Sequence, residues 1–93
     1  MDVEQIKVKI VPILKSAGVT RSSLFGSVVR GEATESSDVD VLVEFPKGKT
    51  LLDLVRLQNE LEGALDRRVD VLTYKSLHHL FRDEVLKSQV PIL

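Results

Sequence analysis

The fold is decided by the stretch Phe25-Gly-Ser-Val-Val-Arg-Gly-Glu-Ala-Thr-Glu-Ser-Ser-Asp-Val-Asp-Val-Leu-Val43, which leads from a glycine-serine turn into a β-branched run. This run begins with Asp38 and Asp40 and favours a β-strand. Because side chains alternate between the two faces of a strand, both carboxylates point one way and the intervening valines point the other. Two carboxylates on one face make a poor core, but their oxygens are the ligands that divalent cations prefer.

A third acid, Asp70, lies in the segment Val69–Leu72, which repeats Val39–Leu42 residue for residue. Aspartate is disfavoured in strands, so its recurrence in this pattern needs a reason. If the two strands are neighbours, three carboxylates meet on one patch, an arrangement that holds two metal ions about 3.5 to 4 Å apart for displacement at phosphorus. Asp70 is also a possible acceptor for the proton of an attacking hydroxyl. The simpler alternative is a solvated strand edge, where charge discourages aggregation.

Gly26 and Ser27 open the same stretch, where an apolar run gives way to a predicted helical turn. Alone, the pair is best explained as a turn that needs a flexible residue and a cap. Beside a metal cluster, the same turn offers N–H groups and a hydroxyl to the outer phosphates of a nucleoside triphosphate. Arg30, one turn along, is predicted either to pair with phosphate or to pair with Glu32, Glu35 or an acid of the cluster. These two interpretations carry equal weight.

The composition predicts one soluble domain spanning residues 1–93. Of the 93 residues, 43% are hydrophobic and 29% are charged, which is typical of a globular domain. A formal net charge of -1 argues against a protein that coats nucleic acid. Cysteine is absent, which excludes disulfides and thiolate metal sites. The amino terminus carries acids and no segment is long and apolar enough to span a membrane, so we expect a cytoplasmic protein.

The spacing of apolar residues predicts helices that cover one face of a sheet. The predicted elements of the first half are a helix from the cap Asp2 to the stop Gly18, kinked or split at Pro12, a strand over residues 19–25, a helical turn over 26–30, a loop over 31–37 and the carboxylate strand up to Phe45.

The second half of the chain predicts two helices and one strand. Thr50 is predicted to cap a helix whose apolar face carries Leu51, Leu54, Val55, Leu61 and Leu65. A strand over residues 68–73 follows, and Ser76 is predicted to cap a last helix. Since Pro91 cannot continue that helix, the apolar end Val90–Leu93 must pack onto the core or onto a partner.

Several other residues give weaker signals. His78 and His79 are adjacent on a predicted helix, so they face different directions and are expected at the surface or toward a partner. For Tyr74 the sequence does not distinguish three roles: packing in the core, stacking on a base, and serving as a site of modification. Lys47 and Lys49 lie in a loop that we expect to be solvated rather than to steer a polyanion. No GxxxxGK[ST], GxGxxG or HExxH pattern is present, which sets aside P-loop hydrolases, dinucleotide binders and metalloproteases.

Gly26-Ser27, ten intervening residues, Asp38-Val39-Asp40 and the later Asp70 together resemble the GSx10DxD signature of the nucleotidyltransferase superfamily related to DNA polymerase beta. The Phe-Gly-Ser-x-x-Arg-Gly wording and the block Arg68–Leu72 resemble in particular the minimal nucleotidyltransferases, known as MNT. This resemblance implies a small mixed sheet of about three strands packed against helices. It also implies two Mg²⁺ ions at the three aspartates and ATP gripped at the Gly-Ser turn.

The resemblance further implies a biological role, because many MNT proteins are antitoxins encoded beside a HEPN ribonuclease. They neutralise it by binding or by adenylyl transfer to a tyrosine. We therefore expect an adenylyltransferase, and a domain this small needs another chain, of the same or a different kind, to hold a bulky acceptor. One alternative is a non-catalytic binding module whose segment Val90–Leu93 masks the toxin. Nucleotidyl transfer to a small molecule such as an aminoglycoside is a further alternative, but its usual accessory domain has no room here.

Overall fold

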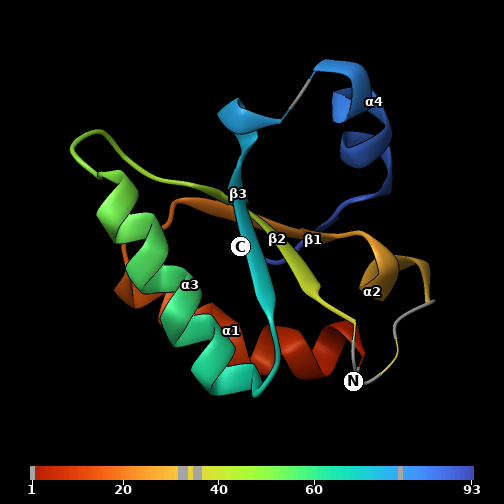
Figure 1. Ribbon diagram of the computed structural model, residues 1–93, viewed down its shortest axis with the longest axis horizontal. Coiled ribbons are helices and arrows are strands. Elements are labelled where there is room, and N and C mark those ends of the chain that lie inside the picture. Colours follow the sequence, from red (N-terminus) through yellow and green to blue (C-terminus); the bar gives the residue numbers. More distant parts are fainter. Residues whose placement is uncertain (1, 32–33, 35–36, 78) are drawn as a thin grey trace.

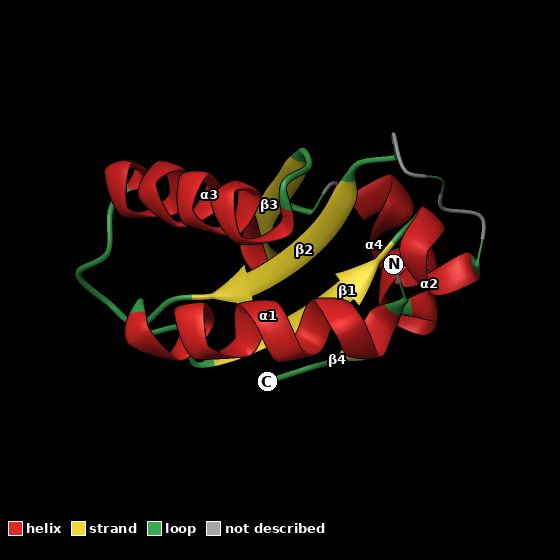
Figure 2. Ribbon diagram, turned by 90° about the horizontal axis from the view of Figure 1, so that it is seen from below, coloured by secondary structure: helices red, strands yellow, loops and turns green. Residues whose placement is uncertain are grey.

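A four-stranded mixed sheet in the order β3-β2-β1-β4 forms the centre of the molecule, and α1 and α3 cover one of its faces (Figures 1 and 2). The computed structural model describes residues 2–31, 34, 37–77 and 79–93. The elements are α1 (Val3–Ser16), β1 (Arg21–Phe25), α2 (Ser27–Arg30), β2 (Val39–Glu44), α3 (Leu51–Leu65), β3 (Val69–Thr73), the 3-10 helix η1 (Tyr74–Ser76), α4 (His79–Ser88) and β4 (Val90–Pro91). The predicted α/β class is therefore confirmed, with one strand more than expected. Of the helices in the described part of the chain, none has the length and apolarity needed to cross a membrane.

The core lies between the sheet and the two long helices. It consists mainly of aliphatic side chains from α1, α3 and the inward faces of the strands: Ile6, Ile10, Leu14, Leu24, Val39, Val41, Val43, Leu57, Leu61, Leu65, Val69, Val71 and Ile92. Burial of each such side chain stabilises the fold by about 1.5–3 kcal/mol relative to exposure. The prediction that the strand valines face the helices is confirmed, and β2 and β3 keep Asp40 and Asp70 out of this core.

Helix α1 runs without a break through Pro12, so of the two expected effects of this proline the split is wrong, and the kink stays a prediction. A capping box starts the helix, in which the Asp2 carboxylate accepts from the Gln5 N–H and the Gln5 side chain accepts from the Asp2 N–H. The carbonyl that Pro12 leaves without a donor belongs to Val8, whose side chain is 74% exposed, so water can reach that side of the helix. The complete burial of Leu14 holds the last turn in place.

Helix α3 begins as predicted, with a capping box between Thr50 and Asp53. Its predicted apolar face is wrong in part, because Leu51 and Val55 are 75% and 48% exposed. The helical period instead places Leu57, Leu61 and Leu65 on the stripe that packs against the sheet, and the first turn of α3 projects past the strands (Figure 1).

The carboxyl-terminal part of the chain differs from the prediction in two ways. Ser76 ends η1 rather than capping the last helix, because its N–H donates to the Thr73 hydroxyl and its own hydroxyl donates to the Thr73 carbonyl. The apolar end of the chain forms β4, which pairs with β1 and buries Ile92. Proline is tolerated at position 91 because β4 is an edge strand. His78 lies outside the described residues.

Candidate active site

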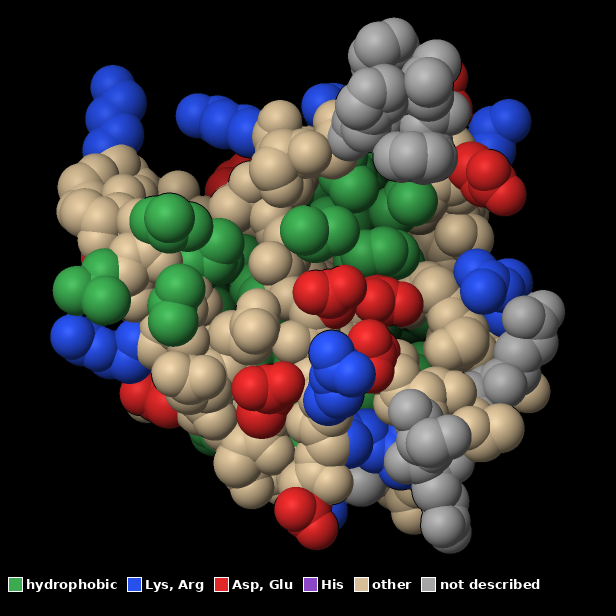
Figure 3. Space-filling view, viewed as in Figure 1, with side chains coloured by type: hydrophobic (Ala, Val, Ile, Leu, Met, Phe, Trp, Pro, Cys, Tyr) green, Lys and Arg blue, Asp and Glu red, His purple; other side chains and the backbone are tan. Residues whose placement is uncertain are grey.

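Asp40 and Asp70 occupy directly opposed positions on the neighbouring parallel strands β2 and β3. Paired residues of adjacent strands lie about 4.8 Å apart and project from the same face, here the face opposite the helix-covered core. Figure 3 shows acidic side chains gathered over the middle of the sheet on this face. The structure therefore brings together two of the predicted site residues that the sequence separates by 30 positions.

Asp38 precedes β2 by one residue and lies at the same end of the sheet. Its side chain is 46% exposed, and one of its oxygens is 4.0 Å from Nε of Arg68. A backbone bond from the Val39 N–H to the Arg68 carbonyl ties the two strand entries together. Arg68 was not predicted as a site residue. It precedes Val69–Leu72 as Asp38 precedes Val39–Leu42, but the register that brings the two side chains together is a property of the folded sheet.

The carboxylate of Asp40 sits in an unfavourable electrostatic environment. Burial raises its pKa above the ordinary value, and the negative charges of Asp70 and Asp38 raise it further. Arg30 acts on Asp40 in the opposite direction and lowers its pKa. The site thus concentrates negative charge that a bound cation would relieve.

Gly26 fits this site only because it has no side chain. Its backbone angles, φ 78° and ψ −151°, lie in a region that is almost exclusive to glycine. A Cβ at this position would overlap a carboxylate oxygen of Asp40. The turn therefore packs directly against the acid cluster, as the combined motif predicts.

Ser27 and Arg30 are the first and last residues of the short helix α2. The N–H groups of Val29 and Arg30 donate to the Gly26 carbonyl, whereas the first amides of a helix have no intrahelical acceptor. The Ser27 hydroxyl makes no hydrogen bond to another described residue, which leaves it available to an anion. Arg30 lies close enough to Asp40 for its charge to lower the pKa of that carboxyl, and both predicted roles, pairing with an acid and contact with phosphate, stay predictions. Glu32 and Glu35 lie outside the described residues.

The aspartates fit the chemistry of a magnesium site, although their side chains are not arranged as one. Among the residues that the structure describes, no three Asp, Glu or His side chains surround a common point that could hold a metal ion. The donor set nevertheless consists of hard carboxylate oxygens, and the mutual repulsion at Asp40 favours a cation. The predicted Mg²⁺ site at Asp38, Asp40 and Asp70 stays a prediction.

Tyr74 has a packing role in this structure. Its buried hydroxyl donates to the Ser23 hydroxyl over 2.9 Å, and the Arg21 guanidinium lies 4.0 Å from the ring centre. These contacts join η1 to β1 and account for the tyrosine without a ligand.

Comparison with known proteins gives consistent relationships over nearly the whole chain. A family model described as "Nucleotidyltransferase domain" matches residues 7–92. A protein of Methanocaldococcus jannaschii named "Putative protein adenylyltransferase MJ0435" is 55% identical over 93 residues, covering all of both chains.

Solved structures show the same fold. A structure described as a "putative minimal nucleotidyltransferase" superimposes with a TM-score of 0.84 at 41% identity and covers 98% of this chain and 96% of its own. The MNT antitoxin in complex with a tri-AMPylated HEPN toxin of Shewanella oneidensis gives a TM-score of 0.75 at 21% identity, covering 97% of this chain and 71% of that one. The second likeness is one of fold alone.

Proposed function

The chain belongs to the nucleotidyltransferase domain family, and from this premise we propose that it transfers AMP from ATP to a hydroxyl of a partner protein of the HEPN toxin type. The single observation that carries the proposal is the position of Asp40. Its carboxylate lies between the glycine turn at Gly26 and the opposed Asp70 of the next strand. A phosphate-binding turn and a cation-binding acid cluster in direct contact are the two parts that nucleotidyl transfer needs.

The proposal of a protein acceptor rests on similar proteins. The protein from M. jannaschii is named for adenylyl transfer to protein, and it matches this chain from end to end. The complex from S. oneidensis pairs a similar fold with an AMPylated HEPN toxin. Together they support a HEPN protein as acceptor and an antitoxin role for this chain.

Two groups of side chains have different proposed roles in the reaction. In the proposed complex, Gly26, Ser27 and Arg30 hold the phosphates of ATP, while Asp38, Asp40 and Asp70 hold Mg²⁺, which neutralises charge on the triphosphate. The acceptor oxygen bonds to the α-phosphorus as the bond from that phosphorus to the α–β bridging oxygen breaks, and pyrophosphate leaves. The exposed carboxylate of Asp70 takes up the hydroxyl proton. The protein contributes positioning and charge stabilisation, which dominate this class of reaction.

Neutralisation by contact alone is the second candidate function. Its proposed masking element, Val90–Leu93, is part of the sheet and the core, because Val90 pairs with Leu24 and Ile92 is buried. This segment is therefore not a free surface for a toxin. Removing it should unfold the sheet edge rather than selectively release a partner.

The proposal is tested by co-expressing the chain with the product of the neighbouring open reading frame, which we expect to be a HEPN protein, and measuring the intact mass of that product. With ATP and Mg²⁺ added, we expect the partner mass to increase by one or more AMP units, localised to a hydroxyl side chain. Omission of Mg²⁺ or replacement of ATP by GTP serves as the control for metal and base. An unmodified partner that is nevertheless inhibited would favour the contact mechanism.

A further inference from the structure

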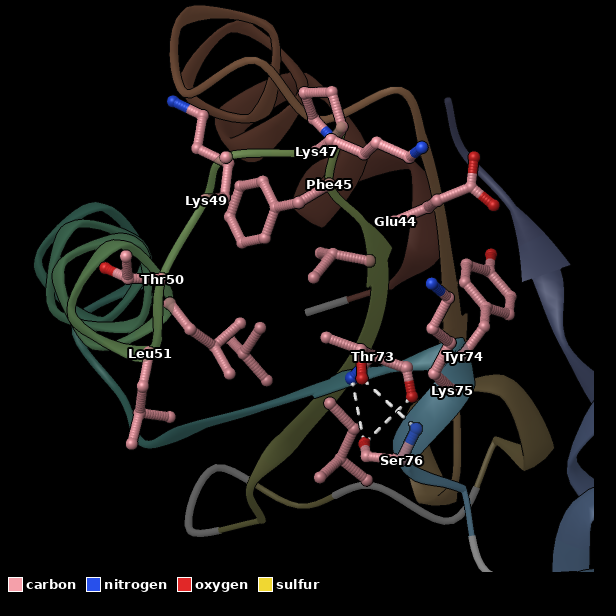
Figure 4. A pocket seen from close by; sticks show the side chains of 16 residues that line it. Glu44, Phe45, Lys47, Lys49, Thr50, Leu51, Thr73, Tyr74, Lys75 and Ser76 are labelled. Carbon is pink, nitrogen blue, oxygen red and sulfur yellow. Dashed lines mark hydrogen bonds between the residues drawn. The ribbon is translucent and has the colours of Figure 1, made fainter.

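A hollow lies at the opposite end of β2 and β3 from the aspartates. It has a volume of about 540 Å³ and opens between the ends of these strands, the loop 45–50 and the start of α3 (Figure 4). Its apolar wall includes Val43, Phe45, Leu54 and Val71. A hollow of this size and character can accept several side chains of a bound molecule.

Apolar surface continues from this hollow onto α3. Among the described residues, the large hydrophobic side chains with high exposure are Val8, Leu51, Leu52 and Val55. Three of the four lie in the first two turns of α3, and Leu51 also lines the hollow. Figure 3 shows hydrophobic side chains at the surface over the start of this helix. We call the hollow together with Leu51, Leu52 and Val55 the α3 face. Leu52 and Val55 are exposed but do not line the hollow, so the apolar surface continues past its rim, which favours a protein segment over a small ligand confined to the hollow.

Positive charge borders the α3 face. Lys47, Lys49 and Lys75 line the hollow, and Glu44 is the one acid among the described residues that do so. The Glu44 carboxylate accepts a hydrogen bond from the Thr20 hydroxyl over 3.0 Å. Lys47 and Lys75 form no ion pair with a described residue. On a chain with a net charge of -1, this concentration of lysine complements carboxylates on a partner.

We propose that the α3 face docks an amphipathic, acidic segment of a partner protein, with its apolar side chains in the hollow and its carboxylates against Lys47 and Lys75. The partner is the acceptor protein only if the proposed function holds; the docking chemistry is independent of it.

The direct test is a titration of the 15N-labelled full chain, followed by NMR, with two synthetic peptides. Both carry leucines at helical spacing, and their polar faces carry glutamate in one and lysine in the other. We expect the glutamate peptide to shift amides of the α3 face and the lysine peptide to leave them unchanged. Equal shifts with both peptides, or shifts confined to other surfaces, would overturn the proposal.

Matched variants locate the contact. Leu51→Glu should weaken binding of the glutamate peptide by about tenfold or more, because it places a carboxylate on the apolar surface. Val8→Glu is the control, since Val8 is 74% exposed against 75% for Leu51 but does not line the hollow. Lys47→Glu with Lys75→Glu should weaken binding similarly, whereas Lys7→Glu with Lys15→Glu, exposed lysines of α1, should not. Equal losses in test and control pairs would contradict the assigned surface.

Two further measurements separate this inference from the catalytic proposal. The Asp40→Asn variant should bind the glutamate peptide and the co-expressed HEPN protein as the native chain does, even if it transfers no AMP. Other occupants are distinguishable by the same NMR spectra. Shifts of the α3 face by laurate but not by the peptide, or by dilution of the chain alone, would instead assign the surface to a lipid or to a second copy.

Discussion

The two ends of the β2–β3 pair are built in opposite ways. At the amino-terminal ends of the strands, Asp38, Asp40 and Asp70 meet a glycine whose missing side chain makes room for a carboxylate. At the carboxyl-terminal ends, lysines and exposed leucines surround an open apolar hollow. The first end brings charged side chains and a glycine turn into close contact, and the second offers apolar area and positive charge. Under the two proposals made above, the first end carries the chemistry and the second recognises the partner.

The largest effect that we expect is the loss of AMP transfer when the acid end is altered. Asp40→Asn keeps the shape of the side chain and removes its charge, so AMP transfer to the partner should fall by about 10²-fold or more. Transfer is measured as the rate of AMP incorporation with ATP and Mg²⁺. Thermal unfolding in the absence of metal should show no loss of stability, because the substitution removes a charge that Asp70 and Asp38 repel. A native rate in this variant would place the reaction elsewhere.

The next effect concerns backbone fit at the same end. Gly26→Ala should destabilise the fold by about 1–3 kcal/mol and reduce transfer, since the added Cβ meets Asp40 and the backbone lies in a glycine-only region. Gly31→Ala is the matched control. Gly31 also has a positive φ, 73°, but nothing lies within 4 Å of a Cβ there, so it should cost only about 1 kcal/mol and leave transfer unchanged. Urea denaturation measures the stability of the two variants, and AMP incorporation measures their transfer rates. Equal losses of transfer in Gly26→Ala and Gly31→Ala would refute the contact with Asp40.

A smaller effect belongs to the other end of the strands. Thr50→Ala removes the capping box that starts α3 beside the hollow and should lower stability by about 1 kcal/mol, with AMP transfer by the folded protein unaffected. Asp2→Ala, which removes the capping box of α1, is the reference variant, and the loss of stability in Thr50→Ala is compared with the loss in Asp2→Ala. A selective fall in transfer rather than stability would show that the two ends are less separate than the structure indicates.

The smallest effect is a difference in pH dependence between the ends. The Thr50 backbone N–H lowers the pKa of Asp53, so this carboxylate stabilises the fold at neutral pH and loses that contribution as the pH falls through its lowered pKa. The raised pKa of Asp40 has the opposite effect on stability: lowering the pH favours the folded protein, because it takes up the proton of Asp40 more readily than the unfolded chain does. Unfolding measured from pH 7 to pH 3 should therefore show Asp53→Asn converging with the native protein. Over the same pH range, the stability of Asp40→Asn relative to the native protein should fall.

The acid end was predictable from the sequence because its chemistry depends on local patterns. Strand alternation placed Asp40 and Asp70 on the face opposite the valines, and ten residues separate the glycine-serine turn from Asp38. The register between β2 and β3 could not be predicted from the sequence, because the pairing of Asp40 with Asp70 depends on the tertiary structure. Arg68 escaped notice because its place beside Asp38 follows from that same register.

The lysine-bordered end was not predicted, for a physical reason. Helical periodicity placed Leu51 and Val55 among the apolar residues of α3, but periodicity does not show where a helix projects beyond its sheet. The exposed leucines and the hollow become visible only when α3, the loop 45–50 and the strand ends are assembled. The same limit applies to Val90–Leu93, whose propensity did not show that it would complete the sheet as β4.

The most direct test of the central claim is to locate the metal nucleotide. Mn²⁺ replaces Mg²⁺ in the complex with ATP, and paramagnetic broadening of amide resonances is recorded on the 15N-labelled chain. If the aspartates hold the metal nucleotide, broadening should be strongest around Gly26, Asp40 and Asp70 and should weaken along β2 and β3 toward residues 45–51 and 74–76. Broadening centred on the lysine-bordered hollow, with the aspartate strands unaffected, would contradict it.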